Sequence, residues 1–132
     1  MSGESNLETL LASMSPVMLD GEYVFCSFTD AAYGDHANLQ PIASIVETEG
    51  LTLVIPKLSA DVNNIPYEGV FKGITLQVHS SLEAVGLTAA FSTKLSEHGI
   101  SANVIAGYFH DHIFVQNDYA KKALDALKKF SS

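Results

Sequence analysis

The chain has a single cysteine, Cys26, in 132 residues, so it cannot form an intrachain disulfide. A protein without crosslinks is favoured in a reducing compartment. The sequence also lacks an apolar run long enough to span a bilayer. Its first residues, MSGESN, are polar and show no signal-peptide pattern. Together these absences predict a soluble cytoplasmic protein.

Basic residues are scarce as well. Seven Lys and Arg stand against 15 Asp and Glu, which gives a net charge of −8. Nucleic acid is therefore not an expected partner, because neutralising phosphates needs clustered cations. An acidic membrane surface is disfavoured for the same reason. The four lysines of residues 121–129 lie in the expected last helix, where they complement the negative end of its dipole.

Motifs of catalysis are also missing: no phosphate loop, dinucleotide fingerprint or nucleophile elbow is present. The best metal candidate is the pair His110 and His112, whose Cα atoms on an extended chain would lie about 7 Å apart. A zinc site needs a third ligand, and His36, His79 and His98 have no fixed spacing to this pair. We therefore expect no metal and no cofactor.

Cys26 is the other candidate for chemistry, as a nucleophile paired with a histidine. It stands inside the apolar segment YVFCSF. A free cysteine in such a segment usually behaves as a small hydrophobic residue. Core packing is the expected role.

What is present is a hydrophobic content of 47%, which is ample for a globular core. In the first half, Leu7 to Met14 have helical spacing, and Pro16 is expected to stop that helix or to lie just beyond it. Three strands are predicted at 22–28, 42–47 and 51–55, and 59–64 is expected to hold one or two helical turns. The polar segment 29–40 is long for a loop in a compact domain, and such loops are often functional.

The last sixty residues predict strand, helix, strand, strand, helix. Strands are expected at 70–79, where apolar and polar residues alternate, and at 103–108 and 112–116, two segments joined by a short connection. The helices are expected at 84–98, ended by Gly99, and from Asp118 onward, with Asp118 as N-cap.

The turn before the first of these helices is a candidate binding site. The free N–H groups at a helix start and the positive end of its dipole can hold a carboxylate. Gly86 would let a ligand approach the backbone closely. Asn103 offers a donor and an acceptor, and Asp111 could accept from an ammonium group. A packing role for Gly86 and a turn role for Asp111 remain open alternatives.

Three segments give this half a recognisable pattern: SLEAVGL at 81–87, LSEHGIS at 95–101 and NVIAGYFHDHIFV at 103–115. They resemble the ACT domain, as found in aspartate kinase regulatory tails, in cytosolic arginine sensors and in stand-alone bacterial tandem ACT proteins. The resemblance implies an α+β, ferredoxin-like fold of two packed βαβ-type units with antiparallel sheets. It divides the chain into a divergent ACT-like unit, 1–68, and an ACT domain, 69–132.

The family fold implied by this resemblance has a βαββαβ order, and the chain ends before the sixth element, a strand. We expect a strand from the N-terminal half to complete the sheet. By the same resemblance, the ligand-binding residues are expected to be Ser81, Val85, Gly86, Leu87, Asn103, Val104 and Asp111.

The function implied is non-catalytic binding of an amino acid or related metabolite by a regulatory sensor module. A homodimer is expected, because ACT sites usually form between units. Any regulated enzyme would be a separate chain. Two alternatives stay open: a small metal-assisted enzyme using His110 and His112, and an interaction or dimerisation domain without a ligand.

Overall fold

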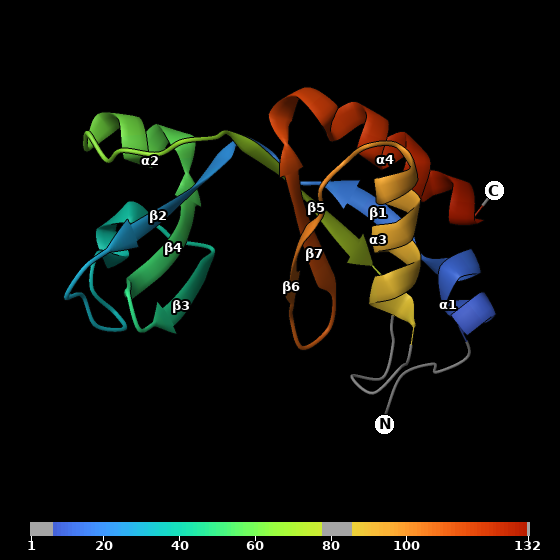
Figure 1. Ribbon diagram of the computed structural model, residues 1–132, viewed down its shortest axis with the longest axis horizontal. Coiled ribbons are helices and arrows are strands. Elements are labelled where there is room, and N and C mark those ends of the chain that lie inside the picture. The colour runs from blue at the N-terminus through green and yellow to red at the C-terminus, as the bar shows by residue number, and fades with distance from the viewer. Residues whose placement is uncertain (1–6, 78–85, 132) are drawn as a thin grey trace. The chain divides into compact units, whose positions relative to one another are not determined.

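The structure, a computed structural model, describes residues 7–77 and 86–131. It divides into two compact units, each α+β (Figure 1). We call Gly21–Phe71 the inserted unit, and Met1–Asp20 with Lys72–Ser132 the discontinuous unit. Residues 7–20 thus pack with the C-terminal part of the chain rather than with the residues that follow them.

The inserted unit has an antiparallel sheet in the order β3-β4-β2-β5, to which β5 contributes its first residue, paired with Tyr23. This is the order of a ferredoxin-like sheet, with the last strand beside the first. A 3-10 turn, η1, stands in the connection where that fold has its first helix. The elements are β2 (Tyr23–Phe28), η1 (Ala37–Leu39), β3 (Ala43–Glu47), β4 (Gly50–Pro56) and α2 (Lys57–Val62), followed by β5 (Phe71–Gln77).

One face of this sheet carries the core of the inserted unit. Alternate residues of β2 and β4 point to this face, and α2 and η1 each add a side chain from above it. Cys26 lies here, 5% exposed, and burial raises the pKa of its thiol. A buried thiol with a raised pKa is a packing group, as the sequence predicts. The buried residues of this core are Val24, Cys26, Leu39, Leu51, Leu53, Ile55 and Ala60.

Gly50 begins β4 in a backbone conformation that only glycine adopts easily. Its φ is +152°, and a Cβ there would lie 2.9 Å from the carbonyl oxygen of Phe28. Because backbone atoms cannot swing aside, we expect Gly50→Ala to reduce the free energy of unfolding by about 1–3 kcal/mol. Urea unfolding would measure this loss. Thr48→Ala, in the exposed turn just before, is the control; equal stability of both variants would contradict the prediction.

The discontinuous unit has a sheet in the order β1-β5-β7-β6. Strand β1 pairs antiparallel with β5, from Ser15 opposite Gln77 to Met18 opposite Ile74. It occupies the position of the last strand of the βαββαβ order, which the C-terminal half lacks. The expectation that N-terminal residues complete this sheet is therefore confirmed. The elements are α1 (Leu7–Ser13), β1 (Ser15–Met18), β5, α3 (Leu87–Glu97), β6 (Asn103–Ala106), β7 (Asp111–Gln116), η2 (Asn117–Tyr119), α4 (Ala120–Lys128) and η3 (Lys129–Ser131).

A larger core joins this sheet to α1, α3 and α4. Gly99 ends α3 as predicted, with φ +73°. The amide of Ile100 donates to the carbonyl of Leu95 at 3.0 Å, and that of Gly99 to Ser96 at 2.9 Å, which is a Schellman motif. The buried core residues are Leu10, Met14, Ile74, Leu76, Leu87, Phe91, Leu95, Ile100, Ile113, Val115, Ala120, Ala123, Ala126 and Leu127.

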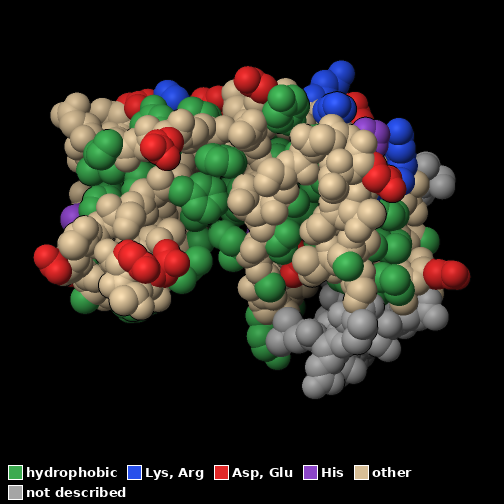
Figure 2. All heavy atoms as spheres, in the orientation of Figure 1, with side chains coloured by type: hydrophobic (Ala, Val, Ile, Leu, Met, Phe, Trp, Pro, Cys, Tyr) green, Lys and Arg blue, Asp and Glu red, His purple; other side chains and the backbone are tan. Residues whose placement is uncertain are grey.

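Helix α1 ends at Ser13, and Pro16 lies just beyond it, as the sequence predicts. Pro16 is inside β1, an edge strand, where a proline costs no ladder hydrogen bond toward a neighbour. One local prediction was wrong. Asp118 does not cap the last helix: α4 begins at Ala120 after a 3-10 turn, and its N-cap position, Tyr119, makes no side-chain cap. The lysines of this region gather over α4 in the space-filling view (Figure 2).

Candidate functional site

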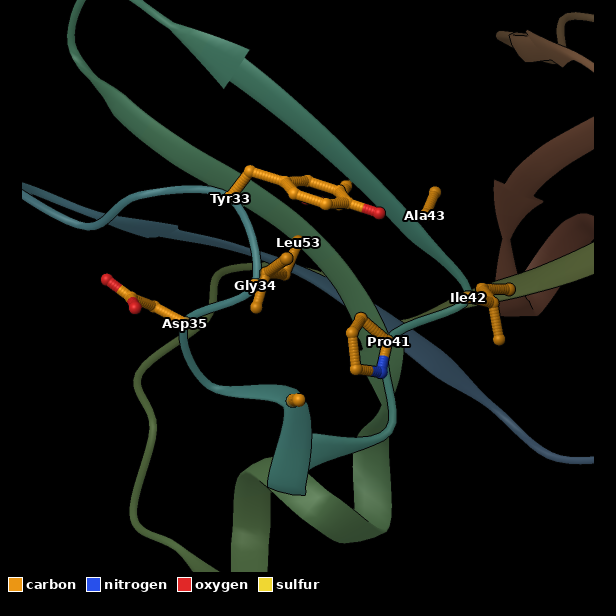
Figure 3. A pocket seen from close by; sticks show the side chains of 9 residues that line it. Tyr33, Gly34, Asp35, Pro41, Ile42, Ala43 and Leu53 are labelled. Carbon is orange, nitrogen blue, oxygen red and sulfur yellow. The ribbon is translucent and has the colours of Figure 1, made fainter.

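A pocket of about 380 Å³ opens in the inserted unit, between the β2–β3 connection and strands β3 and β4 (Figure 3). Its volume is at the lower end of the range for small-molecule sites. The walls are mainly apolar. The lining residues are Tyr33, Gly34, Asp35, Ala37, Pro41, Ile42, Ala43, Ser44 and Leu53.

The connection that frames this pocket, residues 29–42, is held to the core of its unit. Leu39 is 2% exposed within that core, and the ring of His36 stacks on Phe28 with centroids 4.1 Å apart. Its backbone has positive φ at Asp30 and Gln40 as well as at His36. Non-glycine residues in that region are strained, and strain of this kind collects at binding sites. The loop is therefore a fixed part of its unit, packed against the core.

The polar atoms that line the pocket differ in whether they have hydrogen-bond partners. The hydroxyl oxygen of Ser44 is buried and has no hydrogen-bond partner. The carboxylate of Asp35 accepts from the amide of Ala32 at 2.8 Å and is exposed. Tyr33 is 79% exposed, and its ring extends along β3 with the hydroxyl directed toward Ala43 (Figure 3). The length of the loop predicts a functional role, but no sequence motif singles out these residues.

The predicted site lies in the other unit. Ser81 and Val85 fall outside the described residues. Gly86 stands before α3 with φ +90°, and a Cβ on it would lie 3.3 Å from Leu7. Leu87 is 4% exposed and packs in the core, so only its backbone can face a ligand.

The remaining predicted residues lie on the β6–β7 hairpin. Asn103 pairs with Phe114 and donates its amide to the Phe114 carbonyl at 3.0 Å, whereas Asp111 pairs with Ala106. Val104 packs against the core. The two ends of this ladder are three residue steps apart, roughly 10 Å along the strand. Helix α3 begins at the end of the sheet where the hairpin turns (Figure 1). Asp111 therefore shares that end with Gly86, and Asn103 does not.

The histidines beside Asp111 are half-buried. Burial raises the pKa of the Asp111 carboxyl, against the opposing effect of His112. Nδ1 of His112 lies 3.0 Å from Oγ1 of Thr75, while Nδ1 of His110 is buried without a partner. Within the part of the chain that the structure describes, no three His, Cys, Asp or Glu side chains come together as metal ligands. Within that part of the chain, His110 and His112 could therefore supply at most two ligands to a metal ion.

His112 makes the stability of the discontinuous unit depend on pH. Burial, reinforced by the charge of His110, lowers the pKa of His112 below 6.5, while Asp111 acts in the opposite direction. The unfolded chain therefore takes up the proton first, so stability is full above pH 6.5 and falls as the pH drops toward the folded pKa.

We expect denaturant midpoints to fall between about pH 7.5 and pH 5.5, and to fall less in His112→Gln. Asp111 works the other way, because its raised pKa favours the fold as the pH falls further. His98→Gln is the control and should keep the dependence of the parent. An unchanged pH dependence in His112→Gln would contradict the assignment.

Two ferredoxin-like units, one inserted into the sequence of the other, define a tandem α+β protein, and comparison with known families agrees. Residues 2–72 and residues 72–129 each match a model of the ACT domain. The chain belongs to the ACT domain family. Membership supports a regulatory amino-acid-binding module in general. Among the helices of the described residues, none has the length and apolarity needed to cross a membrane.

Solved structures extend the comparison. A Vibrio cholerae protein of unknown function, described as a possible transport protein, is 56% identical over 96% of both chains, with a TM-score of 0.88. An Agrobacterium tumefaciens protein shares the fold at 18% identity, with 89% of each chain covered and a TM-score of 0.69. The regulatory subunit of Thermus thermophilus aspartate kinase shares it at 10% identity, covering 89% of this chain and 97% of that one, with a TM-score of 0.59. No protein of curated function matches the sequence.

Proposed function

We propose that this protein is a non-catalytic regulatory module that binds an amino acid or a related metabolite. The observation that carries the proposal is the pair of ACT matches, which together run from residue 2 to residue 129. Neighbours of the same fold include aspartate kinase regulatory subunits. The protein would act as a cytoplasmic homodimer on an enzyme carried by a separate chain. Its two ACT-type halves would be 1–68 and 69–132, with β1 of the first half completing the sheet of the second. Binding would regulate only if the ligand prefers one arrangement.

The proposed site lies at the start of α3. A ligand carboxylate would meet the helix N-terminus at Gly86 and Leu87, and its ammonium group would meet Asp111. Ser81 and Val85, outside the described residues, stay part of the proposed site. Burial of Asp111 supports this role, because a carboxylate that has lost water gains most from a cation. Asn103 and Val104 lie toward the other end of the β6–β7 ladder. We propose that they reach the ligand from the second copy of a dimer.

A thermal-shift screen of the twenty amino acids tests the function. A ligand at a hundred times its Kd should stabilise the fold by about 2.7 kcal/mol. Titration calorimetry of the positive compound would then give its Kd. If no amino acid raises the melting temperature at millimolar concentration, the proposal fails.

Asp111→Asn tests the site. Losing a charged partner should weaken amino-acid binding by roughly tenfold or more, since such hydrogen bonds contribute about 1.5–3 kcal/mol. The fold should not suffer, because burial already disfavours the charge. Asp118→Asn, at an exposed acid of the same unit, is the control. Equal affinity in both variants would remove Asp111 from the site.

A dimerisation or interaction domain is the second candidate. Tyr108 and Phe109, at the tip of the β6–β7 hairpin, are 77% and 67% exposed, with ring centroids 5.0 Å apart. Exposed aromatic pairs of this kind mark contact surfaces. Sedimentation of the parent and of Phe109→Ala tests this candidate. If the variant loses the dimer and the parent binds no amino acid, the interaction domain is favoured over the amino-acid sensor.

A further inference from the structure

We propose that the pocket of the inserted unit is a separate binding site for a small organic cation, an ammonium or guanidinium group on a short apolar stem. The pocket and all its lining residues lie within residues 21–71. The proposal therefore goes beyond the site at Gly86 and Asp111 and does not depend on it.

The apolar part of the ligand follows from the walls. Leu53, 1% exposed, reaches the pocket from the core face of β4, and Pro41 and Ile42 line it from the end of the loop. Ile42 is 46% exposed, which leaves an apolar surface that a ligand could cover. The β2–β3 connection keeps these walls apart because it is fixed at Leu39 and at the stacked rings of Phe28 and His36. A short hydrocarbon stem would gain by leaving water there.

The polar anchor is Ser44. Ser44 pairs with Leu53 across β3 and β4, so the two side chains share the core face of the sheet. Its hydroxyl oxygen is buried and has no partner within the protein, although buried polar groups are nearly always hydrogen-bonded. A hydroxyl can accept a hydrogen bond as well as donate one. An N–H of a ligand head group would satisfy it.

The charges in and around the pocket favour a cationic ligand. Asp35 is the only charged residue that lines the pocket. In sequence the inserted unit holds seven Asp and Glu against one Lys, a net charge of −6. That lysine, Lys57, lies 2.8 Å from the carboxylate of Asp61. An anion would find no counter-charge here, whereas a cation could meet Asp35 and the exposed ring face of Tyr33.

Three probes of nearly equal shape test this inference on the full chain: 3-methylbutylamine, 3-methylbutanol and 3-methylbutanoate. We expect the amine to shift the amide NMR signals of residues 29–44 at millimolar concentration. The butanoate should bind at least roughly tenfold more weakly, with the alcohol between them. Butanoate binding as tightly as the amine, or an amine that shifts no signal in this segment, would overturn the proposal.

Two variants sharpen the test. Asp35→Asn should weaken binding of the amine by roughly two- to fivefold and leave binding of the alcohol unchanged. The control Asp30→Asn, in the same loop but outside the pocket lining, should change neither affinity. Ser44→Ala should weaken the amine by roughly fivefold and raise the melting temperature of the free protein by about 2–6 °C, because an unpaired buried hydroxyl is lost. An unchanged amine affinity in Ser44→Ala would contradict the anchor. Asp111→Asn should leave amine binding intact, which separates this site from the proposed amino-acid site.

Discussion

Removal of residues 1–20 is expected to unfold the discontinuous unit. The deletion takes away β1, which pairs with β5 over four residues, and a further hydrogen bond from Leu19 to the carbonyl of Gly73. It also removes Leu10 and Met14, each 1% exposed in the core. Loss of each such side chain costs about 2–5 kcal/mol, against a total stability of about 5–15 kcal/mol for a domain. Loss of both, together with an edge of the sheet, leaves too little to fold.

Far-UV circular dichroism and urea unfolding of the truncated chain would measure this effect. Leu10→Ala is the milder version and should lower the free energy of unfolding by about 2–5 kcal/mol. Glu8→Ala, at an exposed position of the same helix, is its control and should change it by less than about 0.5 kcal/mol. A truncated chain that kept the helix content and cooperative unfolding of the parent would show that α1 and β1 are dispensable.

Phe91→Ala is expected to be among the most destabilising single substitutions in the protein. Phe91 is on α3, 0% exposed, and is one of the largest fully buried side chains among the described residues. Truncation to alanine removes an aromatic ring from a close-packed core and leaves a cavity, at a cost of about 3–5 kcal/mol.

Phe109→Ala is the matched control, because the same ring is removed from a position that is 67% exposed. It should change the free energy of unfolding by less than about 0.5 kcal/mol. Denaturant unfolding of both variants would give the comparison. Similar losses for the two would mean that the packing around Phe91 is not what holds the unit together.

Much of the fold was predictable because local pattern and burial agree. Apolar segments bounded by turn residues located β2, β3 and β4 to within about a residue, and β5, β6 and β7 with their starts nearly correct. Gly99 predicted the end of α3, since a left-handed residue closes a helix whatever surrounds it. The resemblance in the C-terminal half then gave the ferredoxin-like family.

Strand β1 was not predictable, although the need for an added strand was. It has four residues, includes Pro16, and pairs with residues about sixty positions away. A segment this short has too little pattern to indicate a strand by itself, and only its partner β5 makes it one.

The candidate sites, too, were predictable from the sequence only in part. Gly86 and Asp111 could be singled out from residue type and position in the fold. That Leu87 points into the core, and that Asn103 lies away from Asp111 along the hairpin, follows from packing and register. The pocket shows this most clearly. Sequence predicted a long functional loop, but the unpaired hydroxyl of Ser44 exists only because the folded loop and sheet exclude water around it.

The sequence by itself determined the acidic, crosslink-free character of the protein, most of its strands and helices, and its family, because these depend on composition and on periodicities within a few residues. Tertiary structure alone decided which N-terminal strand completes the second sheet and which polar atoms line a pocket. Both depend on contacts between residues far apart in the chain, where burial and hydrogen-bond partners are set by the whole unit.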